Sequence, residues 1–230
     1  MSETPAAAPP HPARLLLGSF AMLALDAALL ALGVGGLREL LHHPRAAGLL
    51  LVWAAGYGVL AGVRRMRPRD PLEKHADQRF VLATLVLVPL VSPMLSAWSE
   101  RAGIWPLPGG TALRWAGVAL AGAGFLLRIF AVRQLGARFS PIIEVQRQHA
   151  LETGGVYAWM RHPGYAGAFV CNLGAILAFG SAAPLLLAVV MALATRARVG
   201  REEATLEATF GAEYRRYRER VGRWWPGARR

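Results

Sequence analysis

The sequence has almost no cysteine and long stretches without charge. Cys171 is the only cysteine among 230 residues, so the chain cannot form an internal disulfide or a thiolate metal cluster. Residues 46–63, 80–98 and 165–195 contain no Asp, Glu, Lys or Arg. Acidic residues are also few, since 14 Asp and Glu stand against 26 Lys and Arg. These absences argue against a disulfide-rich secreted domain and against an ordinary soluble domain.

Apolar residues make up 54% of the chain and form five long blocks. A helix that crosses a bilayer needs about 20 apolar residues. Blocks 15–37, 46–63, 80–98 and 112–132 each satisfy this requirement. Block 165–195 is longer, and Pro184 interrupts it, which predicts a helical hairpin turning within 180–184. We therefore expect an all-α polytopic membrane bundle of four spans and a hairpin.

The distribution of cations explains the net charge of +12. Cations crowd three alternate regions and are sparse in the loops between these regions. The three groups are Arg64, Arg65, Arg67, Arg69, Lys74 and Arg79; then Arg133, Arg138, Arg147 and Arg161; then Arg196, Arg198 and Arg201. Cytoplasmic loops of membrane proteins carry such an excess. We predict an integral protein of a bacterial inner membrane with both termini in the cytoplasm, and no nucleic-acid partner.

The blocks divide the chain into three parts. Residues 1–12 are expected to be a disordered lead. The apolar block that follows them fits an uncleaved first span better than a signal peptide. Residues 13–132 hold the four spans, and residues 133–230 hold the polar motifs. At the end of the chain, apolar and aromatic residues recur at spacings of three and four, which predicts a C-terminal cytoplasmic amphipathic helix. They are Leu206, Phe210, Tyr214, Tyr217 and Val221.

A polar segment, residues 149–167, joins two apolar blocks where a membrane surface is expected. Pro163 is compatible with the first turn of a helix, whose free N–H groups attract a carboxylate or phosphate. The rings of Tyr157 and Tyr165 suit a cation. Glu202 and Glu203 add anions beyond the hairpin. A ligand with carboxylate, ammonium, ribose and sulfonium groups, such as S-adenosylmethionine, would use all of these, although a dinucleotide also fits the helix start.

Three other features remain open from the residues alone. Arg128 lies inside an apolar block, where it either reaches an anion or snorkels to the headgroups. Asp26 in the first block is read as a helix-packing or arginine-pairing residue. The pair His42 and His43 has no nearby carboxylate and is read as surface histidines, so no metal site is predicted.

From about Leu127 to Pro226 the chain resembles the isoprenylcysteine carboxyl methyltransferase family, which are integral-membrane enzymes that use S-adenosylmethionine. The first shared motif is H-x-L-x-T-x-G-V-Y-A-W-x-R-H-P-x-Y-x-G, from His149 to Gly167. The second is E-E-x-x-L-x-x-x-F-G-x-E-Y-x-x-Y-x-x-x-V, from Glu202 to Val221. An apolar hairpin separates them, in the order that the family has.

The resemblance implies a cofactor site for S-adenosylmethionine at the cytoplasmic side. Its implied residues come from both motifs: His149, Leu151, Gly155, Tyr157, Arg161, His162, Pro163, Tyr165, Glu202 and Glu203. Arg128 is implied to be catalytic by holding a substrate carboxylate near the methyl group. Glu203 is the second catalytic candidate, because a thiol or amine acceptor would need a base.

The implied reaction is direct methyl transfer to a lipophilic or small carboxylate, thiol or amine, in contact with membrane lipid. Two alternatives remain. Membrane sterol reductases that use NADPH also carry R-H-P-x-Y, but they read R-H-P-N-Y-x-G-E, where this chain has Gly164 and Ala168. A transporter or scaffold without enzymatic activity is the other alternative, which Pro89, Pro93 and Asp26 would favour.

Overall fold

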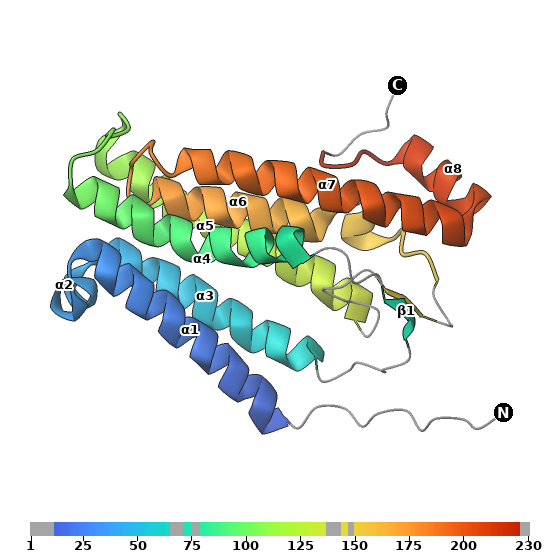
Figure 1. The fold of residues 1–230 in the computed structure, drawn as a ribbon, viewed down its shortest axis with the longest axis horizontal. Coiled ribbons are helices and arrows are strands. Elements are labelled where there is room, and N and C mark those ends of the chain that lie inside the picture. The colour runs from blue at the N-terminus through green and yellow to red at the C-terminus, as the bar shows by residue number, and fades with distance from the viewer. Residues whose placement is uncertain (1–11, 65–70, 75–78, 137–143, 147–149, 226–230) are drawn as a thin grey trace.

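The computed structural model describes residues 12–64, 71–74, 79–136, 144–146 and 150–225 (Figure 1). Helices dominate these ranges, and two short antiparallel strands pair beside them. The elements are α1 Pro12–Val34, α2 Leu37–His42, α3 Pro44–Arg64, β1 Pro71–Lys74, α4 Arg79–Arg101, α5 Gly110–Leu135, β2 Glu144–Gln146, the 3-10 helix η2 Gly155–Ala158, α6 Pro163–Leu177, α7 Leu185–Phe210 and α8 Ala212–Arg220.

Four helices are long and apolar enough to cross a membrane, namely α1, α3, α4 and α5. The shorter α6 and the start of α7 form the predicted hairpin, so the expected helical membrane fold is confirmed. Successive long helices run in opposite directions in Figure 1. We call the end of the bundle that holds the start of α1, η2 and α8 the motif end. The opposite end, with α2 and the α4–α5 and α6–α7 connections, is the turn end.

Helices α5 and α6 make the most extensive contact between two elements, and glycine allows it. A Cβ atom added at Gly124 would lie 2.3 Å from the backbone nitrogen of Cys171. One added at Gly174 would lie 2.3 Å from the backbone nitrogen of Ala121. Small residues let two backbones approach closely inside a membrane, where van der Waals packing drives helix association. This contact fixes α5 against α6 along the bundle.

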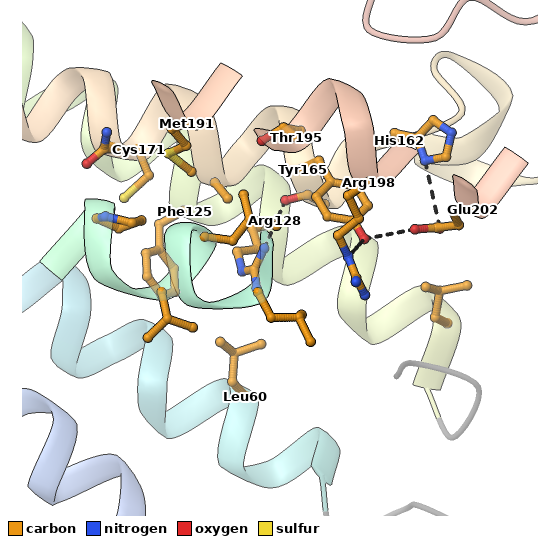
Figure 2. Close-up of a pocket in the computed structure, with 18 of the residues that line it drawn as sticks. Leu60, Phe125, Arg128, His162, Tyr165, Cys171, Met191, Thr195, Arg198 and Glu202 are labelled. Carbon is orange, nitrogen blue, oxygen red and sulfur yellow. Dashed lines mark hydrogen bonds and ion pairs between the residues drawn. The ribbon is translucent and has the colours of Figure 1, made fainter. Parts of the chain in front are cut away.

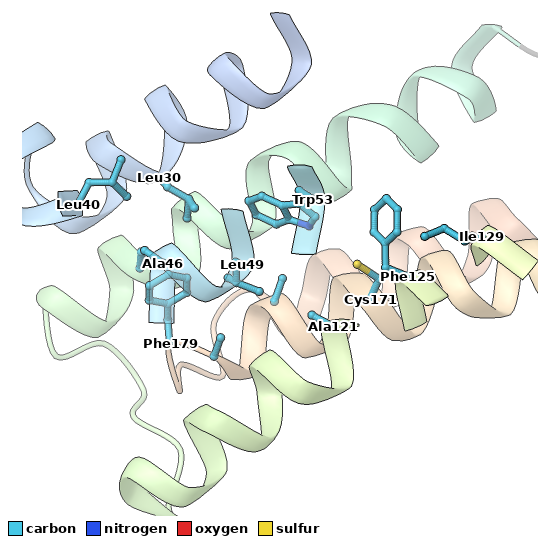
Figure 3. Packing of buried hydrophobic residues seen from close by; sticks show 13 residues of the cluster. Leu30, Leu40, Ala46, Leu49, Trp53, Ala121, Phe125, Ile129, Cys171 and Phe179 are labelled. Carbon is cyan, nitrogen blue, oxygen red and sulfur yellow. The ribbon is translucent and has the colours of Figure 1, made fainter. Parts of the chain in front are cut away.

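The apolar core lies between this helix pair and the first helices. Leu30 of α1, Leu49 and Trp53 of α3 and Phe125 of α5 are buried in one cluster (Figure 3). Tyr57 packs its ring edge-on against Phe125 at a centroid distance of 6.1 Å. Its hydroxyl donates a hydrogen bond of 2.7 Å to Asp26, so Asp26 joins α1 to α3 rather than pairing with an arginine.

A cluster of charges joins the helices at the turn end. Glu100 of α4 lies 3.0 Å from the Arg45 guanidinium of α3 and 2.7 Å from that of Arg114 of α5. Arg45 also donates to the carbonyl of Ala178, beyond the end of α6. We call Glu100, Arg45, Arg114 and the adjacent His43 the turn-end hub. It gives Arg114 and His43 partners at this end of the bundle, whereas His42 is exposed and bonds the carbonyl of Arg38.

The end of the chain differs from the single amphipathic helix predicted for it. Helix α7 continues from the hairpin to Phe210, and Gly211 then reverses the chain with a φ of 51° before α8 begins. Because L side chains rarely adopt that region, glycine suits this break. Tyr214, Tyr217 and Val221 nevertheless form one buried cluster, against which Leu206 and Phe210 pack.

Candidate functional site

A cavity of about 600 Å³ runs from the motif end into the bundle. At the motif end its wall is polar and aromatic, with Tyr157, His162 and Glu202 among its lining residues. Helices α1, α3 and α4 line the rest of it, mostly with apolar side chains such as Leu60 and Leu85. The volume is in the range of sites for small molecules and cofactors. One cavity therefore connects a polar end with an apolar arm.

The two sequence motifs meet at the polar end, although about forty residues separate them. The Tyr165 hydroxyl donates to the Glu202 carboxylate at 2.8 Å. The Tyr217 hydroxyl donates to the carbonyl of Tyr157 at 2.7 Å. Residues 160–162 also run beside the segment after α8, where the Arg161 N–H donates to the carbonyl of Gly222 at 2.9 Å. The start of α6 is thus held between α7 and the end of the chain.

Glu203 is the centre of a buried charge cluster behind the cavity wall. Its carboxylate accepts from the guanidinium of Arg161 at 2.9 Å and lies 3.1 Å from Nε2 of His162. Arg223 donates to both of its oxygens. We call Glu203, Arg161, His162 and Arg223 the motif-end hub. Arg161 also donates to the carbonyl of Val221, so the hub ties η2, α7 and the chain end together.

The partners of Glu203 determine its charge. Burial by itself would raise the pKa of this carboxyl group. Hydrogen bonds from His162, Arg223 and Arg161 outweigh that effect and hold the pKa of Glu203 well below its ordinary value. Glu203 is therefore ionised at neutral pH. A carboxylate with so low a pKa is a poor general base.

A second hydrogen-bond network, about one helical turn from the motif-end hub, faces the cavity. Tyr165 donates to Glu202 while its oxygen accepts from Nε of Arg198 at 2.6 Å (Figure 2). The Glu202 side chain is 29% exposed, against 6% for Glu203. The neighbouring acids therefore differ in role, because Glu202 lines the cavity while Glu203 lies behind it. Burial raises the pKa of Tyr157, so its hydroxyl is neutral.

Arg128 lies where the polar end meets the apolar arm. Its guanidinium donates to the carbonyl of Gly164 at 3.1 Å, on the first turn of α6. Figure 2 shows it between Phe125 and Tyr165. The backbone approach of α5 to α6 sets this position, since a Cβ added at Gly167 would lie 2.7 Å from the Arg128 nitrogen. Arg128 thus points into the protein rather than to the headgroups.

The structure brings most of the predicted site residues to this cavity. Those that line it are Arg128, Leu151, Tyr157, Arg161, His162, Tyr165 and Glu202. Gly155, Pro163 and Glu203 lie close by but are not part of its wall. Gly155 takes a φ of 47° against the side chain of Gln134, and Pro163 opens α6. His149 lies outside the described residues.

Sequence reasoning left some residues of this region without a role. From the sequence, Arg198 is one of the cations assigned to membrane topology. It nevertheless stands one helical turn before Glu202, a spacing that places both side chains on one face of the helix. Arg223 gave no local signal, because only the fold of the chain end brings it to Glu203. Thr195 and Tyr214 also line the cavity and were read as apolar or helical positions.

The fold and cavity define an integral membrane protein with a site embedded in its helical bundle. Residues 116–208 match the family model described as "Isoprenylcysteine carboxyl methyltransferase (ICMT) family". That match confirms, for this part of the chain, the resemblance inferred from the two motifs. It begins within α5 and ends within α7, so it includes Arg128, the start of α6 and Glu202.

Curated relatives match stretches of similar or somewhat greater length. The protein-S-isoprenylcysteine O-methyltransferase of Schizosaccharomyces pombe is 39% identical over 101 residues, 43% of this chain and 43% of that protein. The enzyme of Homo sapiens is 33% identical over 134 residues, 55% of this chain and 47% of that protein. The chain thus spans about half the length of these relatives.

The fold likeness extends further along the chain. A solved structure of the eukaryotic intramembrane Ras methyltransferase superposes with a TM-score of 0.63. The alignment covers 94% of this chain and 78% of that one at 23% identity. The likeness therefore includes the first spans, which carry no motif, and it shows a common fold.

Proposed function

We propose that this protein is a membrane-embedded methyltransferase that uses S-adenosylmethionine and acts on a lipophilic acceptor. The observation that supports it most strongly is the single cavity whose polar end joins both motifs and whose other arm is apolar. The similar relatives are named as O-methyltransferases of isoprenylcysteine. A carboxylate joined to a lipid-like tail is therefore the acceptor that we propose.

The residues of the polar end fit the proposed cofactor. Glu202 provides a carboxylate at the cavity wall, suited to an ammonium group or to ribose hydroxyls. The rings of Tyr157, Tyr214 and Tyr217 provide aromatic faces for a cation and a base. At the start of α6, the backbone N–H groups favour a carboxylate. When bound, S-adenosylmethionine would supply an activated methyl group on its sulfonium.

The chain would then contribute alignment and exclusion of water. Arg161 and His162 hold the first motif through Glu203, so the η2 and α6 wall stays in place. Arg128 would orient the acceptor carboxylate by its guanidinium at the junction of the two arms. A carboxylate is already ionised at neutral pH, so this reaction needs no general base. Fixed orientation in a dry site can supply much of the rate acceleration.

The same proposal sets the orientation in the membrane. Arginines of α7 and α8 lie at the motif end, and an excess of cations marks the cytoplasmic side. We propose that the motif end faces the cytoplasm of a bacterial cell. Residues 13–132 would then supply much of the acceptor arm, with α6 and α7 completing it, and residues 133–230 the cofactor end.

A ligand-binding assay tests the cofactor. Detergent-purified protein should gain thermal stability in S-adenosylmethionine or S-adenosylhomocysteine, because a ligand of the folded state stabilises it by mass action. At one hundred times the dissociation constant the gain is about 2.7 kcal/mol. Stabilisation by NADPH and not by either sulfur ligand would overturn the proposal in favour of a reductase.

The acceptor needs a separate assay. Incubation with methyl-labelled S-adenosylmethionine and a lipid extract should yield a labelled lipid whose label is released by mild base, as expected of a methyl ester. Arg128→Gln should keep the stabilisation by S-adenosylhomocysteine and lose most of the labelled product. Full turnover in that variant would contradict the role that we propose for Arg128.

A further inference from the structure

Polar side chains line the deep end of the apolar arm, where a hydrocarbon tail would need none. Asp26 of α1 and Asn172 of α6, which define what we call the deep end, line the cavity, as does Thr195 of α7 nearer to Tyr165 (Figure 2). They are 5%, 3% and 5% exposed. The proposed methyl transfer uses none of the three. Polar groups inside a membrane-spanning region are costly and mark functional sites.

The hydrogen bonds of these side chains are incomplete within the described part of the chain. Ser92 of α4 donates to the amide oxygen of Asn172 at 2.5 Å, which orients the amide. The amide nitrogen of Asn172 and the hydroxyl of Thr195 have no hydrogen-bond partner there. Buried polar groups are nearly always paired, so such exceptions call for an explanation.

Asp26 supplies a hydrogen-bond acceptor to the same cavity. The Asp26 carboxylate accepts from Tyr57 on one oxygen, and a carboxylate has room for further donors. The thiol of Cys171, the residue before Asn172, interacts electrostatically with both Arg128 and Asp26. Asn172 stands eight residues beyond Gly164, the carbonyl partner of Arg128, which is about 12 Å along α6. The deep polar end is therefore separate from the position of the carboxylate.

We propose that this deep end is a subsite for a hydroxyl group on the tail of the lipophilic acceptor. The hydroxyl would donate to Asp26 and accept from the Asn172 amide. A plain hydrocarbon tail leaves the Asn172 amide nitrogen without an acceptor and adds no donor to Asp26, and an ammonium has no lone pair for the amide. An ether or carbonyl oxygen cannot donate to the carboxylate. The inference rests on the proposed function only in naming the ligand as the methyl acceptor.

Medium-chain fatty acids and their ω-hydroxy counterparts, compared at equal chain length, are the probes. Each carries a carboxylate for Arg128, and only one of each pair carries the distal hydroxyl. We expect the ω-hydroxy acid to stabilise the detergent-purified protein at a concentration lower by about tenfold or more, because a site built for a hydroxyl rejects the analogue that lacks it. Equal potency, or greater potency of the plain acid, would overturn the proposal.

Variants assign the preference to the subsite. Asn172→Leu and Asp26→Asn should each reduce the preference to less than about threefold. Ser96→Ala is the matched control, because Ser96 lies one turn from Ser92 on α4, is buried and bonds the carbonyl of Ile176 on α6. It should keep the preference of the wild type. A preference that survives Asn172→Leu, in a variant that folds, would place the hydroxyl elsewhere and contradict the proposal.

The readout separates this inference from the proposed function. Binding of the acids is measured without the cofactor, and binding of S-adenosylhomocysteine is measured without the acids. Stabilisation by S-adenosylhomocysteine without discrimination between the acids would overturn the hydroxyl subsite alone. Discrimination that is lost in Asn172→Leu, without any response to S-adenosylhomocysteine, would support the subsite and overturn the methyltransferase.

Discussion

Each end of the bundle has one glutamate shared by two arginines beside a histidine. At the turn end Glu100 binds Arg45 and Arg114, whose side chains are 17% and 22% exposed. At the motif end Glu203 binds Arg161, which is 1% exposed, and Arg223, which is 26% exposed, and Glu203 itself is 6% exposed against 21% for Glu100. The residue types are the same, but the hubs differ in burial and in their surroundings.

The difference shows how similar ion pairs serve different purposes. The turn-end hub contributes no residue to the lining of the cavity, and it joins α3, α4 and α5 and, through Arg45, the carbonyl of Ala178 after α6. In the motif-end hub, Arg161 and His162 also line the cavity. Glu203 pairs with Arg161 behind the wall, whereas the neighbouring Glu202 is the acid that lines the cavity. Stability and function should therefore separate in variants of the two hubs.

Glu203→Ala should have the largest effect. Removing one partner of a buried ion pair leaves a buried charge without compensation, which costs about 3–5 kcal/mol. We expect a fall of that size in the free energy of unfolding, measured by denaturant titration in detergent, and loss of stabilisation by S-adenosylhomocysteine. A variant of wild-type stability would show that Arg161 and Arg223 do not depend on Glu203.

Gly124→Leu tests whether packing between the hubs matters as much as the charges. Its side chain would meet the backbone of Cys171, which cannot give way without separating α5 from α6. Overpacking of this kind costs about 1–3 kcal/mol. Gly122→Ala on the same helix is the control, because its Cβ would meet Val52 at an ordinary 3.7 Å. Equal stability of the two variants would contradict the close α5–α6 contact.

Glu100→Ala should cost less than Glu203→Ala, about 1 kcal/mol, because its pairs are partly solvated. The loss should shrink as salt is added, since solvent-exposed pairs are screened. Stabilisation by S-adenosylhomocysteine should be unchanged. A variant that lost this response would show that the turn-end hub is coupled to the cavity, against the distinction drawn between the hubs.

Glu202→Gln should change stability least, by about 0.5 kcal/mol or less, because the side chain is partly exposed and a glutamine can still accept from Tyr165. Its effect should appear instead as a loss of about tenfold or more in affinity for S-adenosylhomocysteine. Unchanged affinity, measured by thermal shift across ligand concentrations, would remove Glu202 from the proposed site.

The pH dependence of stability separates the hubs further. Burial and then Arg45 lower the pKa of His43, while Glu100 opposes them. The unfolded chain therefore takes up a proton at His43 as pH falls through about 6.5, and the folded chain resists it, so stability falls with acidity. Glu203 has a lowered pKa and loses its contribution only below about pH 4.3, the ordinary value for glutamate.

His43→Gln should therefore weaken the loss of stability between pH 7.5 and pH 5.5, while leaving stability at the higher pH nearly unchanged. Thermal unfolding midpoints across that range measure the effect. An identical pH profile for wild type and variant would mean that His43 takes up its proton equally in both states, contrary to its surroundings beside Arg45.

Much of the fold could be predicted because hydropathy and charge act locally along the chain. The four spans, the hairpin and the turn at 180–184 follow from blocks of apolar residues, and the structure has them. The division of the final segment at Gly211 could not be predicted, since a continuous apolar stripe crosses it. Nor could the pairing of β1 with β2, whose partners are about seventy residues apart.

The candidate site was predictable only where a motif carried it. Tyr165 and Glu202 could be named from sequence, and they hydrogen-bond to each other. From the sequence alone, Glu202 and Glu203 form one acidic pair whose members cannot be told apart. Only the tertiary arrangement, which brings Arg161 and Arg223 to Glu203, distinguishes the two carboxylates. Asn172 and Asp26 lie in apolar blocks, where nothing local indicates that both line one cavity.

The most direct test of the central claim is a structure of the purified protein with S-adenosylhomocysteine. The account predicts the ligand in the polar end of the cavity, between η2, the start of α6 and the Glu202 side chain, with Glu203 still bound to Arg161. A ligand bound at the turn end, or a polar end without ligand at saturating concentration, would contradict it.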